Sequence, residues 1–399
     1  MTPPALLLGG LNLVRALGLA RIPVIVASAE RDNPAFASRF CTRGLVLPPP
    51  GRRTELLDAL MSAGERAYAE AGERMPLFYG DDDMLALVHA QRQPLERWFA
   101  FLLNEPSTAA ALLDKDRFQT LTRARRLPVP RALEFSELAQ HDGPVIVKPR
   151  SKAGWENAAV HRDLMGAGAK ARRFPSGRAA IAHPLVARYG EELAFQEYID
   201  GDDRELWSFH GFAARDGTML ASFTGRKLRT YPALVGESSF IELVPNPDLE
   251  RVGREIAERL ELKGVFKMDL KRDRAGRFHL LEINARYNLW HYLGAKNGVN
   301  LPAIAYRYLR RGERPERATA GSVYRWLCPR LDWFAYREAA ARREITLARY
   351  LASLLERPKV YDLFSWTDPR PFVQRYIRKA RAVPRVTRRL LSRWLSTAS

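Results

Sequence analysis

Apolar runs separated by turn signals divide the N-terminal part of the chain into alternating strands and helices. An apolar run over 5–8 is followed by a helical pattern over 12–20 and a second apolar run over 22–27. This order predicts a βαβ opening. The apolar segment Met75–Tyr79 predicts a later strand of the same sheet. The pattern therefore predicts a small doubly wound α/β domain over residues 1–108.

The middle of the chain predicts a more mixed arrangement of helices and strands. Strands are expected at 145–149, 193–197, 207–213 and 220–224, and helices at 112–127 and 249–260. The Gly-, Ala- and basic-rich stretch 151–177 predicts a mobile loop region, and residues 225–232 predict a basic loop.

A hairpin near residue 270 carries the strongest chemical signal. A strand over 266–270 and a turn over 273–276 precede a second strand over 277–284. Alternation places Glu282 and Asn284 on one face of the second strand, with Asp269 on the first. Two carboxylates and an amide oxygen suit Mg²⁺, which carboxylates and substrate phosphates hold together. A surface hairpin with solvated charges is the alternative.

Beyond residue 315 the pattern becomes helical and basic. Helical spacing over 334–355 precedes an aromatic loop over 361–369. Residues 375–393 hold eight basic and no acidic residues, with apolar residues between them. This segment suits an amphipathic helix on anionic lipid or a contact with nucleic-acid phosphates. A terminal helix packed on the body, with its arginines in water, is the alternative.

Composition narrows the class of protein. The chain has 399 residues, 46% of them hydrophobic and 27% charged, which predicts two or three globular domains. Its two cysteines exclude a disulfide framework and favour a reducing cytosol. No apolar run approaches a membrane span, and the N-terminus lacks the basic region of a signal peptide. A formal charge of +19 favours anionic partners.

A series of charged residues in a characteristic order resembles the ATP-grasp superfamily, which includes D-alanine–D-alanine ligase, biotin carboxylase and carbamoyl-phosphate synthase. The series is Lys115, Lys148, Glu197, Lys227, Asp269, Glu282, Asn284 and Arg286. Residues 282–286, Glu-Ile-Asn-Ala-Arg, are similar to the Glu-x-Asn-Pro-Arg signature of carbamoyl-phosphate synthase, with Ala285 in place of proline. Residues 195–201 resemble the adenine-binding hinge strand of the superfamily. Residues 225–232 resemble a little-characterised bacterial branch of carboxylate–amine ligases.

The resemblance implies an α/β and α+β multidomain architecture. A Rossmann-like pre-ATP-grasp domain would occupy residues 1–108. The ATP-grasp domain would follow over 109–312, with a lid subdomain over about 109–195 and a catalytic subdomain over about 196–312. A helical extension with a basic tail would occupy 313–399.

For the phosphates of ATP, the resemblance implies Lys115 and Lys148 on the lid and Lys227 opposite them. Without the resemblance, Lys148 could point to water and Lys115 could form a helix-surface ion pair with its neighbouring aspartates. Phosphoryl transfer needs cations at the phosphates and little covalent help. One departure concerns the flap over 150–157, which holds a single glycine where family members are glycine-rich.

For the nucleoside, the resemblance implies that Glu197 accepts the adenine amino group. Backbone groups near Tyr198 and Ile199 would bind the adenine edge, and Asp203 or its neighbour Asp202 the ribose. Glu197 could instead be solvated, and the two aspartates could be ordinary turn residues.

For the reaction centre, the resemblance implies that Asp269, Glu282 and Asn284 hold one or two Mg²⁺ ions, with Mn²⁺ as an alternative. Arg286 and Lys267 would hold an acyl-phosphate oxyanion. Lys267 could instead be a plain strand-face cation.

The substrate is expected near Gly9-Gly10, Asp81 and the loop 288–300. Each of these has a plainer alternative: a tight turn for the two glycines, a helix cap for the aspartates at 81–83, and a packed helix for 290–300.

The expected activity is an ATP- and Mg²⁺-dependent carboxylate–amine ligase that forms an amide through an acyl phosphate. Alternatives are a kinase-type phosphotransferase and a basic nucleotide-binding protein on anionic membrane or nucleic acid. Expected partners are a small-molecule carboxylate and an amine, with nucleic acid disfavoured. The expected location is the cytoplasm, with the 375–395 tail as a peripheral contact to the inner membrane face. The sequence leaves the substrates and the oligomeric state open.

Overall fold

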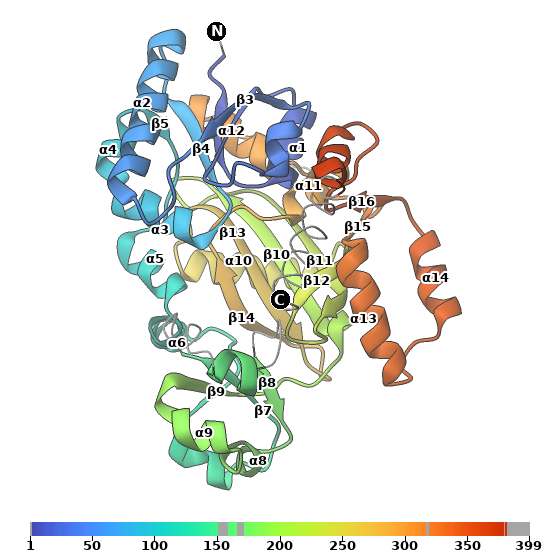
Figure 1. The fold of residues 1–399 in the computed structure, drawn as a ribbon. Helices are drawn as coiled ribbons and strands as arrows, with labels where there is room; N and C mark the ends of the chain where they lie inside the picture. Colours follow the sequence, from blue (N-terminus) through green and yellow to red (C-terminus); the bar gives the residue numbers. More distant parts are fainter. Residues whose placement is uncertain (1, 151–158, 166–170, 317–318, 379, 381–399) are drawn as a thin grey trace, which may run out of the picture.

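Three sheets organise the computed structural model, which describes residues 2–150, 159–165, 171–316, 319–378 and 380. Figure 1 shows a central sheet with the N-terminal domain above it and a small lid domain below it. The predicted flap over 150–157 lies almost wholly outside the described residues, as does the basic tail beyond residue 380.

The N-terminal domain is built on a five-stranded sheet in the order β3-β2-β1-β4-β5. Each neighbouring pair in it is parallel. Its strands are β1 (Ala5–Leu8), β2 (Val24–Ser28), β3 (Cys41–Val46), β4 (Met75–Tyr79) and β5 (Phe99–Ala100). The βαβ opening and the strand at 75–79 are confirmed.

Helices cover both faces of this sheet, because its strands present apolar side chains on each side. They are α1 (Leu11–Leu19), α2 (Arg53–Ala71), α3 (Asp82–Ala90) and α4 (Arg92–Glu96), with a 3-10 helix at Pro34–Ala37. Leu13 and Leu17 of α1 join one core, and Leu56 and Leu60 of α2 join another on the opposite face.

The lid domain has a four-stranded sheet in the order β6-β9-β7-β8. Its strands are β6 (Ala132–Leu133), β7 (Val145–Pro149), β8 (Arg172–Phe174) and β9 (Leu193–Glu197). Its helices are α5 (Pro106–Leu113), α6 (Lys115–Ala124), α8 (Gly177–Ile181) and α9 (Pro184–Tyr189), with a π-helix at Ala159–Met165 and 3-10 helices at Phe135–Gln140 and Gly190–Glu192.

One expected helix of the lid is divided. The prediction of a single helix over 112–127 is wrong, because Asp114 is extended and its carboxylate caps α6 by accepting from the amides of Asp116 and Arg117. The cap orients the first turn of α6, where Lys115 lies.

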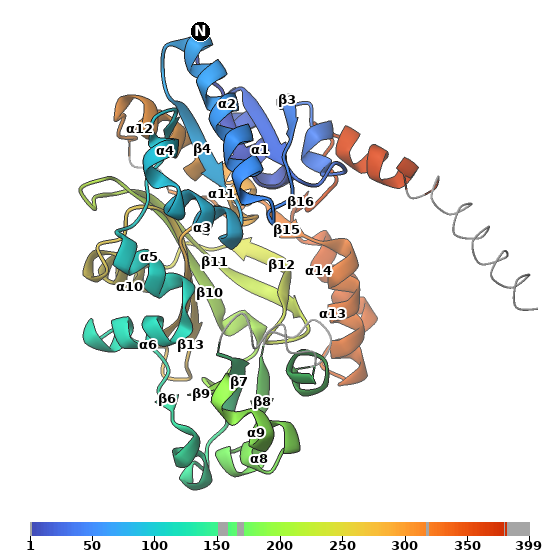
Figure 2. The ribbon, with the colours of Figure 1, turned by 60° about the vertical axis from the view of Figure 1, so that its left-hand side comes forward.

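The central sheet has seven strands in the order β14-β13-β10-β11-β12-β15-β16. They are β10 (Leu206–Ala213), β11 (Met219–Tyr231), β12 (Glu237–Leu243), β13 (Gly264–Arg272), β14 (Phe278–Asn284), β15 (Arg325–Leu327) and β16 (Lys359–Tyr361). The associated helices are α10 (Pro247–Arg259), α11 (Trp290–Lys296) and α12 (Leu301–Arg311), with a 3-10 helix at Asp203–Glu205. Figure 2 shows this sheet between the other two domains.

The expectation of a basic loop over 225–232 is also wrong, because β11 continues as a strand to Tyr231 and pairs with β12. Arginines of β11 form ion pairs with carboxylates of other segments. Arg226 pairs with Glu242 and Arg229 with Asp332, each with 2.8 Å between the charged atoms. These ion pairs allow a basic segment to lie in a sheet interior.

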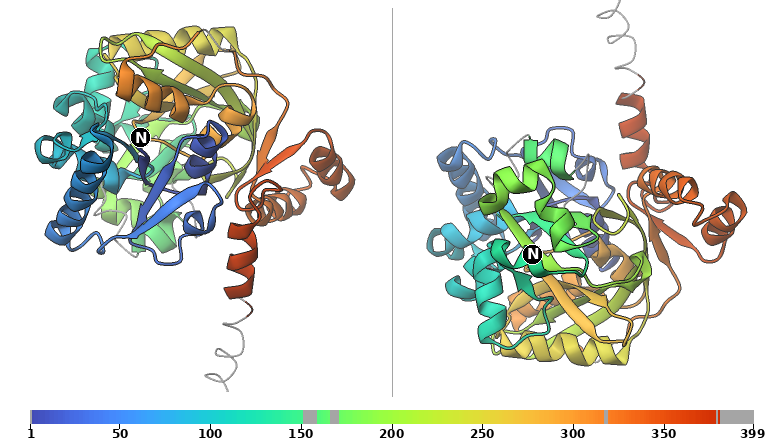
Figure 3. Two further views of the ribbon diagram at one scale, coloured as in Figure 1. Left: turned by 90° about the horizontal axis from the view of Figure 1, so that it is seen from above. Right: turned by 90° about the horizontal axis from the view of Figure 1, so that it is seen from below.

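The C-terminal extension belongs partly to the central sheet. Strands β15 and β16 form its edge beyond β12, and the helices α13 (Pro329–Ala341) and α14 (Leu347–Leu355) project beside it. Asp368, fully buried, then pairs with the equally buried Arg15 of α1 at 3.0 Å. A last helix over 370–378 leaves the body there (Figure 3). Within the described residues, no helix is long and apolar enough to cross a membrane.

Candidate active site

Four polar side chains share one face of the β13–β14 hairpin. Lys267 pairs with Asn284 across the two strands, and Asp269 pairs with Glu282. The intervening Met268 lies in the core on the opposite face, as alternation requires. The hairpin thus holds two carboxylates, an amide and an ammonium group on one surface, the arrangement that the sequence predicted for Asp269, Glu282 and Asn284.

Asp269 is the buried member of this set. Lys267 Nζ lies 2.6 Å from Asp269 Oδ2, and the Ser208 hydroxyl donates to Oδ1. Burial opposes ionisation of this carboxyl. The charges of Lys267 and Lys227, with the two hydrogen bonds, nevertheless hold the pKa of Asp269 below its usual range. Asp269 is therefore a carboxylate at neutral pH.

Two lysines of the lid lie close enough to Glu282 to interact with its charge. Burial lowers the pKa of Lys148, and Glu282 partly offsets that effect. Burial and the charge of Lys148 lower the pKa of Lys115 to about 8, again offset by Glu282. Lys148 donates to the Gln196 amide oxygen at 3.2 Å, and Lys115 to the Pro149 carbonyl. The lid thus places two ammonium groups, of Lys115 and Lys148, close together and near the exposed Glu282 carboxylate of the central sheet.

Lys227 completes the cationic group from the central sheet. Its charge acts on Lys267, on Asp269 and on Asp203. The four lysines predicted from the sequence are therefore gathered around the hairpin face. Several partly desolvated cations beside two carboxylates and an amide oxygen fit a polyphosphate carrying a divalent cation.

The region expected to receive the nucleoside holds a cation that the sequence reasoning missed. Glu197 ends β9 and lies 3.7 Å from Arg131, and Tyr198 follows it. Lys271, almost fully buried, donates to the Tyr198 hydroxyl at 2.9 Å and lies 4.2 Å from the centre of its ring. Burial lowers the pKa of Lys271 to about 8. The sequence could have identified Lys271, because it continues the alternation of Lys267 and Asp269 along β13 and therefore lies on the same face.

Asp203 binds the backbone of its own domain. Its carboxylate accepts hydrogen bonds from the amide and hydroxyl of Thr230 and from the amide of Leu234. These bonds position the segment after Lys227. A ribose would therefore have to share an acceptor that is already engaged, and the role of Asp203 in ribose binding stays a prediction. The backbone contact of Tyr198 and Ile199 to adenine likewise stays a prediction.

Arg286 joins the hairpin to the N-terminal domain. Its guanidinium donates two bonds to the Asp82 carboxylate, at 2.6 and 3.2 Å, and one to Asn284 Oδ1 at 3.2 Å. The neighbouring Asp81 caps α3 by accepting from the Met84 amide, so the helix-cap alternative holds for that residue. The N-terminal domain is thus fixed against the end of β14.

The helix that was expected to line the substrate pocket is largely buried. Trp290, His291 and Leu293 of α11 are fully or almost fully buried, and α11 packs against α1, as the packed-helix alternative proposed. Gly80 approaches Gly9 so closely that an added Cβ would lie 3.2 Å from its Cα. The absence of side chains at Gly9 and Gly80 therefore allows the backbone after β1 to approach the backbone after β4.

Sequence reasoning also missed residues behind the hairpin. Ser208 on β10 faces Asp269 and is fully buried, and His210 faces Lys267 in the same pairing. His210 stacks on Phe223 with 4.5 Å between ring centres, and burial holds its pKa well below its usual value. It is a neutral packing residue.

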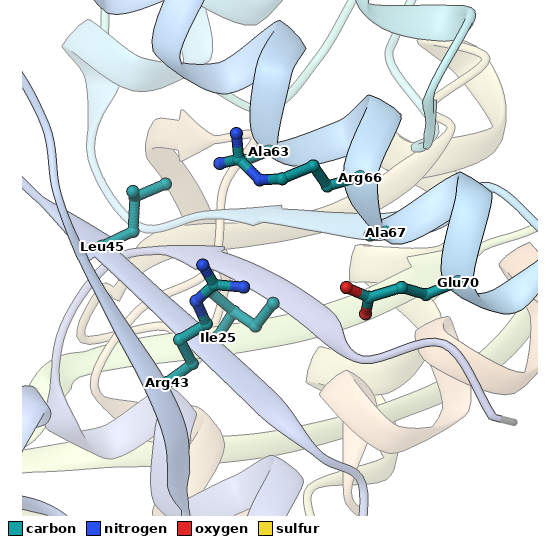
Figure 4. A pocket seen from close by; sticks show the side chains of 7 residues that line it. All are labelled: Ile25, Arg43, Leu45, Ala63, Arg66, Ala67 and Glu70. Carbon is teal, nitrogen blue, oxygen red and sulfur yellow. The ribbon is translucent and has the colours of Figure 1, made fainter.

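Hollows elsewhere on the surface do not coincide with this cluster. A hollow of about 20 Å³ lies between β2, β3 and α2, where Arg43, Arg66 and Glu70 converge (Figure 4). A wider one of about 530 Å³ lies between Tyr231 and α13. Neither is lined by a predicted site residue. In the described part of the chain, no group of three or more His, Cys, Asp or Glu side chains could hold a metal ion, so Asn284 would have to complete a metal site.

The family described as "ATP-grasp in the biosynthetic pathway with Ter operon" matches residues 213–327. That range contains six predicted site residues: Lys227, Lys267, Asp269, Glu282, Asn284 and Arg286. The chain has the ATP-grasp fold. The fold that the sequence resemblance implied is thereby confirmed. No curated protein matches the chain.

Solved structures share this fold at low sequence identity. An N5-carboxyaminoimidazole synthetase from Staphylococcus aureus, complexed with ADP, has a TM-score of 0.57 at 12% identity over 80% of each chain. A biotin carboxylase from Campylobacter jejuni has a TM-score of 0.56 at 14% identity, covering 79% of this chain and 72% of that one. An L-amino acid ligase from Bacillus licheniformis has a TM-score of 0.54 at 14% identity, covering 76% and 73%.

Proposed function

We propose that this protein is an ATP- and Mg²⁺-dependent ligase that joins a small-molecule carboxylate to an amine. One observation carries the proposal: Lys115 and Lys148 of the lid interact with Glu282 of the hairpin that also holds Asp269. Cations from one domain thus face carboxylates from another, as transfer of a phosphoryl group from ATP requires. The names of the similar structures, an amino acid ligase among them, agree with this reaction class.

In the first step, a substrate carboxylate oxygen attacks the γ-phosphorus of ATP and ADP leaves. Lys115, Lys148 and Lys227 would bind the phosphates and stabilise their charge. Asp269, Glu282 and Asn284 would hold Mg²⁺, or Mn²⁺ as an alternative. The metal ion would supply neutralisation of the charge on the phosphates.

In the second step, the amine nitrogen attacks the carbonyl carbon of the acyl phosphate. The carbon–oxygen bond to phosphate breaks, phosphate leaves, and the nitrogen loses a proton. Lys267 and Arg286 would stabilise the oxyanion that forms at the carbonyl oxygen. Both lie on or beside the hairpin face, and the engagement of Arg286 with Asp82 would orient its guanidinium. No side-chain nucleophile is required.

For the nucleoside, we propose that the backbone around Tyr198 and Ile199 binds the adenine edge and that Glu197 accepts from its amino group. Asp203 would contact the ribose through an oxygen that it shares with Thr230. These roles rest on the resemblance and on the position of the segment beside β13.

The test is a screen of the purified protein with ATP, Mg²⁺ and pooled carboxylic acids and amines. The expected result is release of ADP and phosphate that requires both an acid and an amine, with an amide of matching mass. ADP formed with a stable phosphorylated product and no need for an amine would indicate the phosphotransferase alternative. Nucleotide binding without any turnover would contradict both enzyme activities.

We also propose that the protein works in the cytoplasm on small molecules and contacts the inner face of the membrane peripherally through its basic C-terminus. The charge of +19 and the absence of acidic residues after Asp368 support this location.

A further inference from the structure

The segment over residues 366–378, called the terminal segment below, exposes apolar side chains that a globular body normally covers. Trp366 is 87% exposed, Val373 47% and Ile377 44%. Helical spacing of four residues puts Val373 and Ile377 on the same side of the helix over 370–378. The body does not cover this side, and Figures 2 and 3 show the helix projecting away from it.

The charged residues of the same helix are all basic. Arg370, Arg375 and Arg378 are all exposed, and the periodicity places Arg375 and Arg378 away from the Val373 side. Arg378 reaches Asp32 of the body, at 2.5 Å. The sequence after Asp368 contains no acidic residue through to its end. An apolar stripe on a helix whose charged residues are all basic is the pattern of a helix that lies in an anionic lipid surface.

The body holds the beginning of the terminal segment rigidly. Asp368 is fully buried, accepts from Arg15 and Ser38, and receives the amide of Arg39. Phe372 packs against Phe364 with 5.4 Å between ring centres. The apolar stripe is therefore presented at a fixed position on the N-terminal domain, remote in sequence from the hairpin that holds Asp269 and Glu282.

We propose that the terminal segment is a membrane-docking surface that inserts Trp366, Val373 and Ile377 among the headgroups of anionic lipids. Arg370, which lies three residues before Val373, and Arg375 contact the lipid phosphates. This inference specifies the membrane contact proposed above and rests on none of the ligase chemistry. Nucleic acid is disfavoured, because phosphate-backbone binding gives no role to exposed valine and isoleucine side chains.

The test is sedimentation of the full chain with vesicles of phosphatidylcholine alone and of phosphatidylcholine mixed with phosphatidylglycerol. Binding is expected only to the mixed vesicles. Val373→Ser with Ile377→Ser is expected to weaken it by about tenfold or more, because the lost insertion scales with buried apolar area. Arg370→Gln with Arg375→Gln is expected to weaken it by about fivefold per residue.

A matched control lies on α14, where Leu351 and Leu355 are 50% and 84% exposed without belonging to the terminal segment. Leu351→Ser with Leu355→Ser is expected to leave vesicle binding unchanged. Equal weakening by these substitutions would overturn the proposal, as would full binding by the Val373/Ile377 variant. Binding of a DNA duplex in place of vesicles, insensitive to Val373 and Ile377, would also overturn it. ATP turnover measured on the same samples shows separately whether the proposed ligase activity fails.

Discussion

Lysines of the central sheet and of the lid differ in the partners that compensate their charge. On the sheet, Lys267 contacts the Asp269 carboxylate at 2.6 Å, so the buried charge is neutralised within the protein. On the lid, Lys148 donates to a neutral amide, and among the described residues it forms no ion pair. The charges that act between it and its surroundings are those of Lys115 and Glu282.

The buried charges of the sheet are thus neutralised within the protein, whereas those of the lid are not. A buried pair such as Lys267 and Asp269 is costly to break, because removal of one partner leaves the other charge uncompensated. Like charges held together, such as Lys115 and Lys148, cost free energy until an anion binds between them. The sheet is thus organised in advance, and the lid is organised to respond to an anionic ligand.

The largest effect is expected from the carboxylates of the hairpin. Glu282→Gln or Asp269→Asn removes a charge proposed to hold Mg²⁺, and we expect turnover to fall by about a thousandfold or more. Steady-state ADP release measures this, and circular dichroism checks that the fold persists. Glu255→Gln, on the surface of α10, is the control and should keep full turnover. Normal turnover in both hairpin variants would remove the metal assignment.

The next effect concerns stability and tests the contrast directly. Lys267→Met leaves Asp269 buried without its cation, so the free energy of unfolding should fall by about 3–5 kcal/mol. Lys148→Met removes a desolvated charge, so the free energy of unfolding should rise by about 0.5–2 kcal/mol. Urea unfolding followed by fluorescence measures both. Changes of the same sign in the two variants would contradict the distinction between sheet and lid.

The substitution Lys148→Met, which should stabilise the fold, should weaken the binding of ATP. Lys148→Met removes a charge-assisted contact to phosphate, and we expect the affinity for ATP to fall by about tenfold to a hundredfold. Isothermal titration calorimetry measures the dissociation constant. Lys263→Met is the matched control, since Lys263 precedes β13 and its ammonium group is paired with Glu105 at 2.7 Å. An unchanged dissociation constant in Lys148→Met would contradict the phosphate assignment.

The smallest expected effect is a dependence on pH. Because the pKa of Lys115 lies at about 8, this lysine loses most of its charge as the pH rises from about 7 to about 9, where an ordinary lysine stays charged. The affinity for ATP should therefore fall by up to about tenfold between pH 7 and pH 9. Lys115→Arg keeps its charge over this range and should flatten the profile. A profile that is equally steep in both proteins would assign the titration to another group.

Some of this arrangement could be predicted from the sequence because it is local. The hairpin at Asp269 and Glu282 follows from alternation and from the turn at 273–276, which together set the register. The opening βαβ unit follows from its apolar runs in the same way. These features depend on residues close together in the chain.

Other features escaped prediction because distant residues determine them. Residues 226–231 look like a loop until Glu242 and Asp332 supply the charges that let β11 continue. The approach of Lys115 and Lys148 to Glu282 depends on how two domains pack, which no local pattern encodes. The roles of Asp203 and Glu197 toward a nucleoside stay predictions, because they depend on a bound ligand.

The buried ion pair of Arg15 and Asp368 has a consequence for how the protein is made. Domains generally fold in the order in which they are synthesised. Here the guanidinium of Arg15 receives its carboxylate only after 353 further residues have been added to the growing polypeptide. The first domain therefore completes its core only after residue 368 has been synthesised, and any shortened version of the gene should still encode Asp368.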